Sequence, residues 1–351
     1  MKKGLFVIFY LFTLLLAACN KHTTDSGNNS GNNSGNNNVT TNYPASFTCL
    51  PLDTANIYTV YPLGSLNPPG HTTPTDHIYF YLDSNGSPHP QVPVYAVGTG
   101  TITTIEGYSD AGVFINFNSN QQYYYYHINL NSSYKVGDIV KAGDKIGVTS
   151  GQGAIDLGYF DLSGSILPRL INPQRYTKST QYAVNPVSIY SSNLQTYLYA
   201  KEGAIINQKG GKVDFGISGT LKGDWFDSTA SQTQTGGPAW WNLTLSFSCS
   251  PLDTNQLRIC IGSTGAASSN NISIPGIFAI KNNTPKFELV NTSSGLVKYV
   301  LYDQYDLAAS ANPNPFGLML VQVISDQKIK VETTANLNAT AFTNAARNYV
   351  R

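Results

Sequence analysis

Short runs of β-branched and aromatic residues, separated by clusters of Gly, Asn, Pro and Ser, fill the chain from residue 55 onward. Val, Ile, Thr, Tyr and Phe favour the pleated surface of a sheet, whereas Gly, Asn, Pro and Ser favour turns. Examples of such runs are IYFYL, TGTITTI, GVFINF, QYYYYHI, KVDFGI and GLMLVQVI. Only the last residues, around NATAFTNAARNYV, have a pattern that favours a helix. The sequence therefore predicts an all-β protein.

The segment SSNLQTYLYAKEGA, residues 191–204, interrupts this pattern and separates two β-rich parts. We expect a linker there, between a β domain over residues 46–190 and a second β domain over residues 205–351. A chain of 351 residues is long enough for two hydrophobic cores. The second part has no pattern typical of a metal site or a nucleophile, and its strands predict an antiparallel sandwich or barrel.

The N-terminus has the organisation of a secretory signal. Two lysines precede an apolar run, residues 5–16, which two alanines separate from Cys19. This run is too short to cross a bilayer comfortably. Its LLAAC ending resembles the lipobox of bacterial lipoproteins, in which the cysteine is lipidated and becomes the mature N-terminus; an ordinary signal peptide or an uncleaved anchor is the alternative. The resemblance implies that residues 1–19 are a lipoprotein signal peptide, and Asn20 is similar to signals for the outer membrane of the bacterial envelope.

Residues 20–45 include NNSGNNSGNNN and offer almost nothing that can be buried. Such a segment cannot offset the entropy of ordering, so it predicts a flexible tether. The formal net charge is +1 and the sequence has no basic run. Because nucleic-acid binding needs a basic surface, we expect no nucleic-acid partner.

Three cysteines remain if Cys19 carries lipid: Cys49, Cys249 and Cys260. An envelope compartment is oxidising and permits disulfides. Cys249 and Cys260 flank SPLDTNQLRI, a spacing that suits two adjacent strands. The sequence therefore predicts a Cys249–Cys260 disulfide and leaves Cys49 as the odd cysteine, whose pairing stays open.

Residues 92–153 form an ordered series of motifs: VPVYAVGTGTITTI, then GVFINF, then QYYYYHINLNSSYKVGDIVKAGDKIGVTSGQG. In this order they resemble the lysostaphin/LytM-type zinc endopeptidases, which cut peptide cross-links in bacterial peptidoglycan. The resemblance implies that family's antiparallel β fold and places His127, at the end of YYHI, in its Tyr-x-His motif. Biotinyl and lipoyl carrier domains share the hairpin but need a modifiable lysine, commonly between methionines. Met1 and Met319, the only two methionines, cannot provide that setting.

The hairpin KVGDIVKAGDKIG also has a physical reading of its own. Gly137 and Gly143 fall where the backbone reverses and positive φ is needed. We expect four residues to supply its buried faces: Val136, Ile139, Val140 and Ile146.

The stretch GHTTPTDHIYFYL, residues 70–82, lies where the family has its first metal ligands, in a His-x-x-x-Asp motif. The resemblance implies that His71 and Asp76 bind the metal, although four residues separate them here instead of three. His77 is an alternative nitrogen ligand, but in an extended segment it would point away from Asp76. The other reading is a loop entering a strand, with polar side chains that only cap the turn.

The family completes its zinc site with a His-x-His pair on a later strand, but no histidine follows His127 in this chain. GAIDLGYFDL takes that place, and the pair falls on residues 156–158 or on residues 157–159. Asp156 or Asp161 would substitute as a carboxylate ligand, yet one histidine with two aspartates is a weaker zinc site. We therefore predict an incomplete zinc site, in which a histidine introduced on this strand restores zinc binding.

Tyr123, Tyr125 and His127 alternate along one strand, so we expect them to share a face. Together with Tyr159 they would line a polar and aromatic binding groove, in which His127 is the catalytic residue if hydrolysis is retained.

Three functions follow from these features. The first is a lipid-anchored envelope protein whose LytM-like domain binds peptidoglycan or a cell-wall partner without cutting it. The second is an active zinc endopeptidase with a rearranged metal site of His71, Asp76 and a carboxylate from Asp156 or Asp161. The third is a structural or adhesive surface lipoprotein.

Overall fold

The computed structural model describes residues 42–68, 70–83, 89–204, 209–231, 233, 235, 242–262, 276–281, 284–304 and 313–351. Cys19 and most of the expected tether, up to residue 41, lie outside the described residues. Among those that are described, no helix combines the length and the apolar character that a membrane crossing requires.

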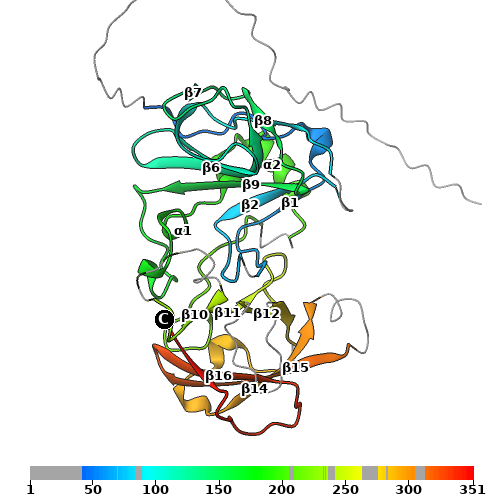
Figure 1. The fold of residues 1–351 in the computed structure, drawn as a ribbon, viewed down its shortest axis with the longest axis vertical. Coiled ribbons are helices and arrows are strands. Elements are labelled where there is room, and N and C mark those ends of the chain that lie inside the picture. The colour runs from blue at the N-terminus through cyan, green and yellow to red at the C-terminus, as the bar shows by residue number, and fades with distance from the viewer. Residues whose placement is uncertain are drawn as a thin grey trace, which may run out of the picture. The chain divides into compact units, whose positions relative to one another are not determined.

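The first sheet is antiparallel and has nine strands, in the order β1-β2-β9-β6-β5-β4-β7, with β8 pairing both β3 and β6 (Figure 1). The strands are Thr59–Tyr61 (β1), His77–Tyr81 (β2), Pro93–Tyr95 (β3), Gly100–Glu106 (β4), Ala111–Asn116 (β5), Gln121–Leu130 (β6), Ile139–Val140 (β7), Lys145–Thr149 (β8) and Ala154–Asp161 (β9). These antiparallel strands confirm the all-β prediction for the LytM-like part.

In the part of the chain that the structure describes, the short helical elements lie mainly after this sheet. They are the α-helices Lys178–Gln181 (α1) and Ser192–Lys201 (α2), and the 3-10 turns Thr54–Asn56, Pro173–Arg175, Pro186–Ile189, Phe287–Leu289 and Thr292–Ser294. Helix α2 falls inside the segment expected to be a linker, residues 191–204.

One face of the first sheet packs on a hydrophobic core, because side chains alternate along each strand. Tyr123 and Tyr125 of β6 and Leu157 of β9 are buried in this core. Their neighbours Tyr124 and Asp156 consequently point to the opposite face. Strands β6 and β9 are neighbours in the sheet, and Tyr126 pairs with Asp156 and Tyr125 with Leu157.

A β-bulge interrupts this alternation at His127. Ala111 pairs with Ile128, whereas Val113 pairs with Tyr125, so β6 holds one more residue than β5 between the two pairs. His127 itself has φ of 64°, in the left-handed region. An extra residue reverses which face the following side chains take.

The hairpin around β7 has the expected turn glycines, with φ of 97° at Gly137 and 86° at Gly143. Val140 and Ile146 are buried, but Val136 and Ile139 are exposed, contrary to prediction. Strand β7 has only two residues, so one of its side chains faces the core and the other faces solvent.

The second sheet is a closed barrel with its own core, which confirms the predicted second β domain. Its strands are Gly223–Asp227 (β10), Thr244–Cys249 (β11), Leu257–Ile261 (β12), Gly276–Ala279 (β13), Val297–Asp303 (β14), Pro315–Ser325 (β15), Lys328–Thr334 (β16) and Arg347–Val350 (β17). The expected C-terminal helix is wrong: β17 pairs with both β10 and β16. Backbone hydrogen bonds to the edges of β10 and β16 outweigh the weak helix preference of this segment.

The predicted Cys249–Cys260 disulfide is also wrong, since both thiols are free and buried. Cys249 pairs in register with Leu257, and Cys260 with Ser246. Positions 246 and 249 are three residues apart on one strand, so the two thiols lie on opposite faces and cannot meet.

Candidate functional site

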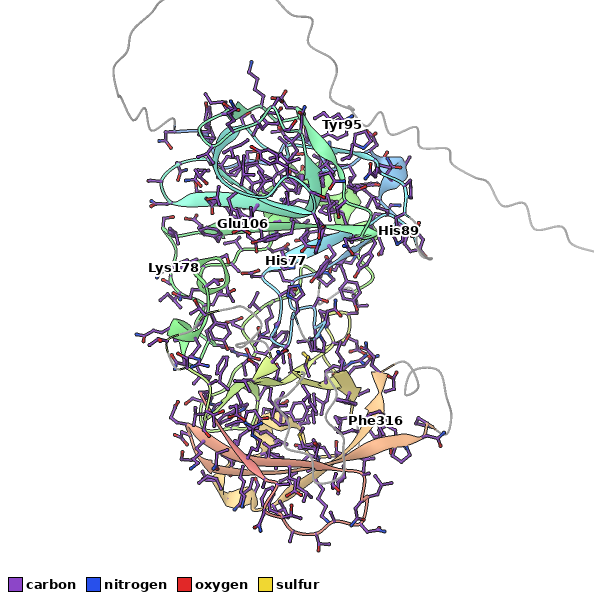
Figure 2. All side chains as sticks on the ribbon, viewed as in Figure 1. His77, His89, Tyr95, Glu106, Lys178 and Phe316 are labelled. Carbon is purple, nitrogen blue, oxygen red and sulfur yellow. The ribbon has the colours of Figure 1, made fainter. Side chains whose placement is uncertain are left out.

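A groove of about 460 Å³ lies on the face of the first sheet that points away from the core. Its lining includes His71, Asp76, His127 and Asp156, which are the four residues predicted to be catalytic or metal-binding. Figure 2 shows His77, another lining residue, on β2. The structure therefore brings the predicted residues together, and the details of their contacts decide what they can do.

Asp76 is held by four donors. The hydroxyl of Tyr124 donates to Oδ1 at 2.7 Å, and His77 Nδ1 lies 3.1 Å from the same oxygen. The hydroxyls of Ser179 and Thr180, on helix α1, donate to Oδ2 at 2.8 and 2.6 Å. Burial alone would raise the pKa of Asp76, but His77 and the hydroxyl donors outweigh it and hold the pKa well below its usual range. Asp76 is a charged, fully engaged carboxylate.

His77 lies between two carboxylates. Its Nδ1 faces Asp76, while its Nε2 lies 3.3 Å from Asp156 Oδ2 and 3.1 Å from the Tyr79 hydroxyl. Burial would lower its pKa, but the charge of Asp156 and the hydrogen bond with Asp76 raise it. The sequence predicted that Asp76 and His77 point apart. They meet because Asp76 lies in a bend and the strand begins only at His77.

His127 reaches the groove because of the bulge. Its Nδ1 lies 3.0 Å from Asp110 Oδ1 and its Nε2 lies 3.7 Å from Asp156 Oδ2. Asp156 is almost fully buried, and burial raises its pKa against the opposing charges of His77 and His127. Asp156 thus connects two histidines from different strands.

His71 packs edge-on against His77, with ring centroids 5.2 Å apart. Burial and the neighbouring charge of His77 lower the pKa of His71 to about 3, so its imidazole is neutral at physiological pH. A neutral imidazole is a hydrogen-bonding group or a ligand, not a counter-ion.

Gly158 lies at one of the positions that the sequence resemblance assigned to the family's later histidine, and Tyr124 lies beside it. Gly158 pairs with both His77 and Tyr124, so it lies on the groove face. This selects the 156–158 register over the 157–159 register. A Cβ atom at position 158 would stand 2.0 Å from Cζ of Tyr124. The phenol ring therefore occupies the space of a side chain at 158.

The predicted aromatic groove residues lie elsewhere. Tyr123, Tyr125 and Tyr159 are buried in the core, where Tyr123 donates to the Gly98 carbonyl. Asp161, the alternative carboxylate ligand, accepts hydrogen bonds at the far end of β9 from Gln121 and Ser163 and does not line the groove.

Tyr124 and Tyr126 line the groove in their place. Simple alternation correctly puts Tyr123 with Tyr125, but it wrongly extends that face to His127 across the bulge. Ser179 and Thr180, more than 100 residues from Asp76 in sequence, gave no sequence signal at all.

The arrangement does not fit a zinc ion as the family would hold it. Such an ion needs about three protein ligands and one open position. In the described part of the chain, no group of three or more His, Cys, Asp or Glu side chains is arranged to hold a metal. Asp76 already accepts from three hydroxyls and contacts His77, and Gly158 has no donor atom.

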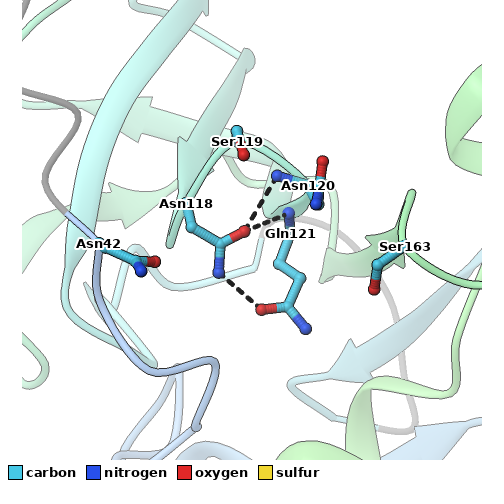
Figure 3. Close-up of a pocket in the computed structure, with 6 residues that line it drawn as sticks. All are labelled: Asn42, Asn118, Ser119, Asn120, Gln121 and Ser163. Carbon is cyan, nitrogen blue, oxygen red and sulfur yellow. Dashed lines mark hydrogen bonds between the residues drawn. The ribbon is translucent and has the colours of Figure 1, made fainter.

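A second hollow, of about 430 Å³, lies at the turn between β5 and β6 (Figure 3). Asn118 accepts from the backbone of Asn120 and Gln121 and donates to the Gln121 side chain at 2.7 Å. These amides bond to one another within the turn, so the hollow is a feature of turn structure.

The groove lies within a segment that matches a known family: the profile of peptidase family M23 covers residues 63–158. This segment is an M23-type domain. No curated protein matches the chain.

Several solved structures resemble the M23-type domain. Helicobacter pylori Csd3 is 14% identical with a TM-score of 0.29, covering 45% of this chain and 40% of its own. A zinc-containing peptidase from Vibrio cholerae is 21% identical with a TM-score of 0.24, covering 35% of this chain and 41% of its own. The catalytic domain of lysostaphin from Staphylococcus simulans is 23% identical with a TM-score of 0.25, covering 32% and 86%. This chain thus spans well under two thirds of the first two.

Proposed function

We propose that this protein is a lipid-anchored protein of the bacterial envelope whose M23-type domain binds the peptide part of peptidoglycan, or a cell-wall partner, without cleaving it. One observation carries the proposal: the Tyr124 ring occupies the space of a side chain at position 158 and its hydroxyl donates to Asp76, while Tyr124 and Asp76 both line the groove. The scaffold is kept and the hydrolytic metal set is incomplete.

Two observations favour peptidoglycan as the ligand: the family resemblance, and the size and lining of the groove. Lysostaphin, one of the similar structures, is described as an antimicrobial peptidase, and another is described as a putative glycyl-glycine endopeptidase from Ruminococcus gnavus. A groove of about 460 Å³ with polar and aromatic walls is of the size that binds a short peptide.

Metal analysis combined with two assays tests the proposal. Purified protein should contain no stoichiometric zinc, release no fragments from peptidoglycan, and bind soluble muropeptides in titration calorimetry. His71→Ala should weaken muropeptide binding, whereas His89→Ala, outside the groove lining, should not. Stoichiometric zinc with cleavage that His71→Ala abolishes would overturn the proposal.

A second candidate function is an active zinc endopeptidase with a rearranged site. It is favoured by Asp156, whose Oδ1 has no hydrogen-bond partner among the described residues although it is buried. Zinc-dependent release of peptidoglycan fragments that Asp156→Asn abolishes would establish this function in place of the first.

The proposal of a lipid anchor is based on the LLAAC sequence and on the Asn-, Ser- and Gly-rich segment that follows it. Cys19→Ser should release the protein from the membrane fraction, because a lipidated cysteine would be its membrane attachment. Cell fractionation with immunoblotting measures this. Unchanged membrane retention would identify the apolar run, residues 5–16, as an uncleaved anchor.

A further inference from the structure

The charge of the groove is unbalanced. Three carboxylates line it, from Asp76, Glu106 and Asp156, and no lysine or arginine is among the lining residues. A ligand that carries positive charge is therefore favoured over a neutral or anionic one.

Asp156 supplies the specific contact. Its side chain is 3% exposed, it lines the groove, and its Oδ2 lies close to His77 and His127. Its Oδ1 is buried and, within the described residues, has no hydrogen-bond partner. Buried carboxylate oxygens are nearly always paired, so this atom is the acceptor that a bound ligand would satisfy.

Aromatic rings stand beside these carboxylates. Phe114 stacks on Tyr124 with centroids 5.2 Å apart, and Tyr126 meets Phe114 edge-on at 5.9 Å. The Tyr126 hydroxyl donates to Glu106 at 3.0 Å, which fixes both side chains at the rim. Cations are attracted to aromatic faces, and more strongly when partly desolvated.

From these three observations we infer that the groove binds a primary ammonium group of a peptide, received by Asp156 Oδ1 beside the Phe114, Tyr124 and Tyr126 rings. An ammonium has three donors and no acceptor, which matches an acceptor-only oxygen. A guanidinium is a poorer match, because its two parallel donors need both oxygens of a carboxylate and Oδ2 already faces two histidines. This inference rests on the proposed peptide-binding function.

The ammonium has two sources in a peptide, its N-terminus and an amino-bearing side chain. Titration calorimetry with Ala-Lys-Ala in four forms separates them: both amines free, the N-terminus acetylated, the lysine acetylated, or both acetylated. Acetylation of the recognised amine should weaken binding about tenfold or more, because a charge-assisted hydrogen bond is lost. Equal binding of the free and doubly acetylated peptides would overturn the inference, as would no binding of the free peptide.

Three variants locate the site. Asp156→Asn should weaken binding of the free peptide about tenfold or more, and Glu106→Gln by a smaller factor because Glu106 is exposed. Asp303→Asn, an exposed carboxylate on β14 of the barrel, is the matched control and should bind as wild type. If Asp156→Asn is unfolded by circular dichroism, Glu106→Gln decides alone. Wild-type affinity in every folded groove variant would overturn the assignment.

Muropeptides with free and with acetylated amines distinguish this inference from the proposed function. If both forms bind equally, the protein binds cell-wall peptide and the ammonium site is wrong. If neither form binds while Ala-Lys-Ala does, the ammonium site stands and the cell-wall ligand is wrong. Loss of binding on acetylation supports both.

Discussion

The ring of Tyr124 occupies the space in which a side chain at Gly158 would stand, with a Cβ at 158 only 2.0 Å from Cζ of the ring. Gly158→Ala should therefore lower the free energy of unfolding by about 1–3 kcal/mol, because the ring must move and repack. Urea denaturation measures this. Gly203→Ala, whose nearest neighbour would be 3.9 Å away, is the matched control. Equal stability of the two variants would show that the ring moves freely.

The Tyr124 hydroxyl is expected to contribute to stability as well. Tyr124→Phe removes the 2.7 Å hydrogen bond to the charged Asp76 and should lower the free energy of unfolding by about 1.5–3 kcal/mol. Tyr126→Phe removes a similar bond to the exposed Glu106 and should change stability by about 0.5 kcal/mol or less. If both variants lose the same free energy of unfolding, the hydrogen bond from Tyr124 to Asp76 contributes no more to stability than the exposed one to Glu106.

Zinc should not stabilise the protein. An ion that binds the folded state at a hundred times its Kd stabilises it by about 2.7 kcal/mol, which a melting experiment detects easily. Because Asp76 is fully engaged and Gly158 offers no donor, added Zn²⁺ should leave the Tm unchanged. Treatment with a chelator should likewise have no effect. A saturable rise of the Tm with zinc would show that Asp76 can leave its hydrogen-bond donors and bind a metal.

Stability should fall as the pH rises through about 6, because of Asp224 in the barrel. Burial raises the pKa of Asp224 from 3.8 to about 6, although Ser246 and Tyr176 donate to it. The folded state then holds this proton more tightly than the unfolded state, so the stabilisation is full below about pH 4 and is lost by about pH 7. The loss is about 2–3 kcal/mol.

Urea denaturation at pH 5 and pH 7.5 measures the Asp224 contribution. The difference between the two values should shrink in Asp224→Asn and persist in Asp303→Asn. An unchanged difference in Asp224→Asn would assign the pH dependence to other groups.

Cys249 and Cys260 should react only after unfolding. Both thiols are buried, and burial raises the pKa of Cys249 to about 11 and raises that of Cys260 as well. Because the thiolate is the reactive form, iodoacetamide at pH 8 should label neither in native protein and both in denaturant without reductant. Intact mass spectrometry counts the labels. Failure to label in denaturant would indicate a disulfide.

Much of the first sheet could be predicted because its signals are local. Turn glycines such as Gly137 and alternating apolar residues follow from backbone sterics and burial, and the motif order identified the M23-type domain. The groove could be predicted only in part. His71, Asp76, His127 and Asp156 do line it, yet the hydroxyls that donate to Asp76 come from α1 and from Tyr124 on the groove face of β6.

The errors have a common physical cause. The bulge at His127 shifts the alternation by one residue, and no residue pattern near it announces the shift. Cys249 and Cys260 were judged by spacing, whereas the register between β11 and β12 places them on opposite faces. Faces depend on register, and register is a tertiary property.

The contact between Gly158 and Tyr124 also constrains which sequences this fold can reach by single substitutions. A change at 158 to any larger residue meets the ring, and a change of Tyr124 to a smaller residue leaves Asp76 without one of its donors. Each single change lowers stability, and only the pair together makes room for a histidine on β9. The two positions are therefore coupled, because a side chain at 158 gains room only at the expense of the contact between Tyr124 and Asp76.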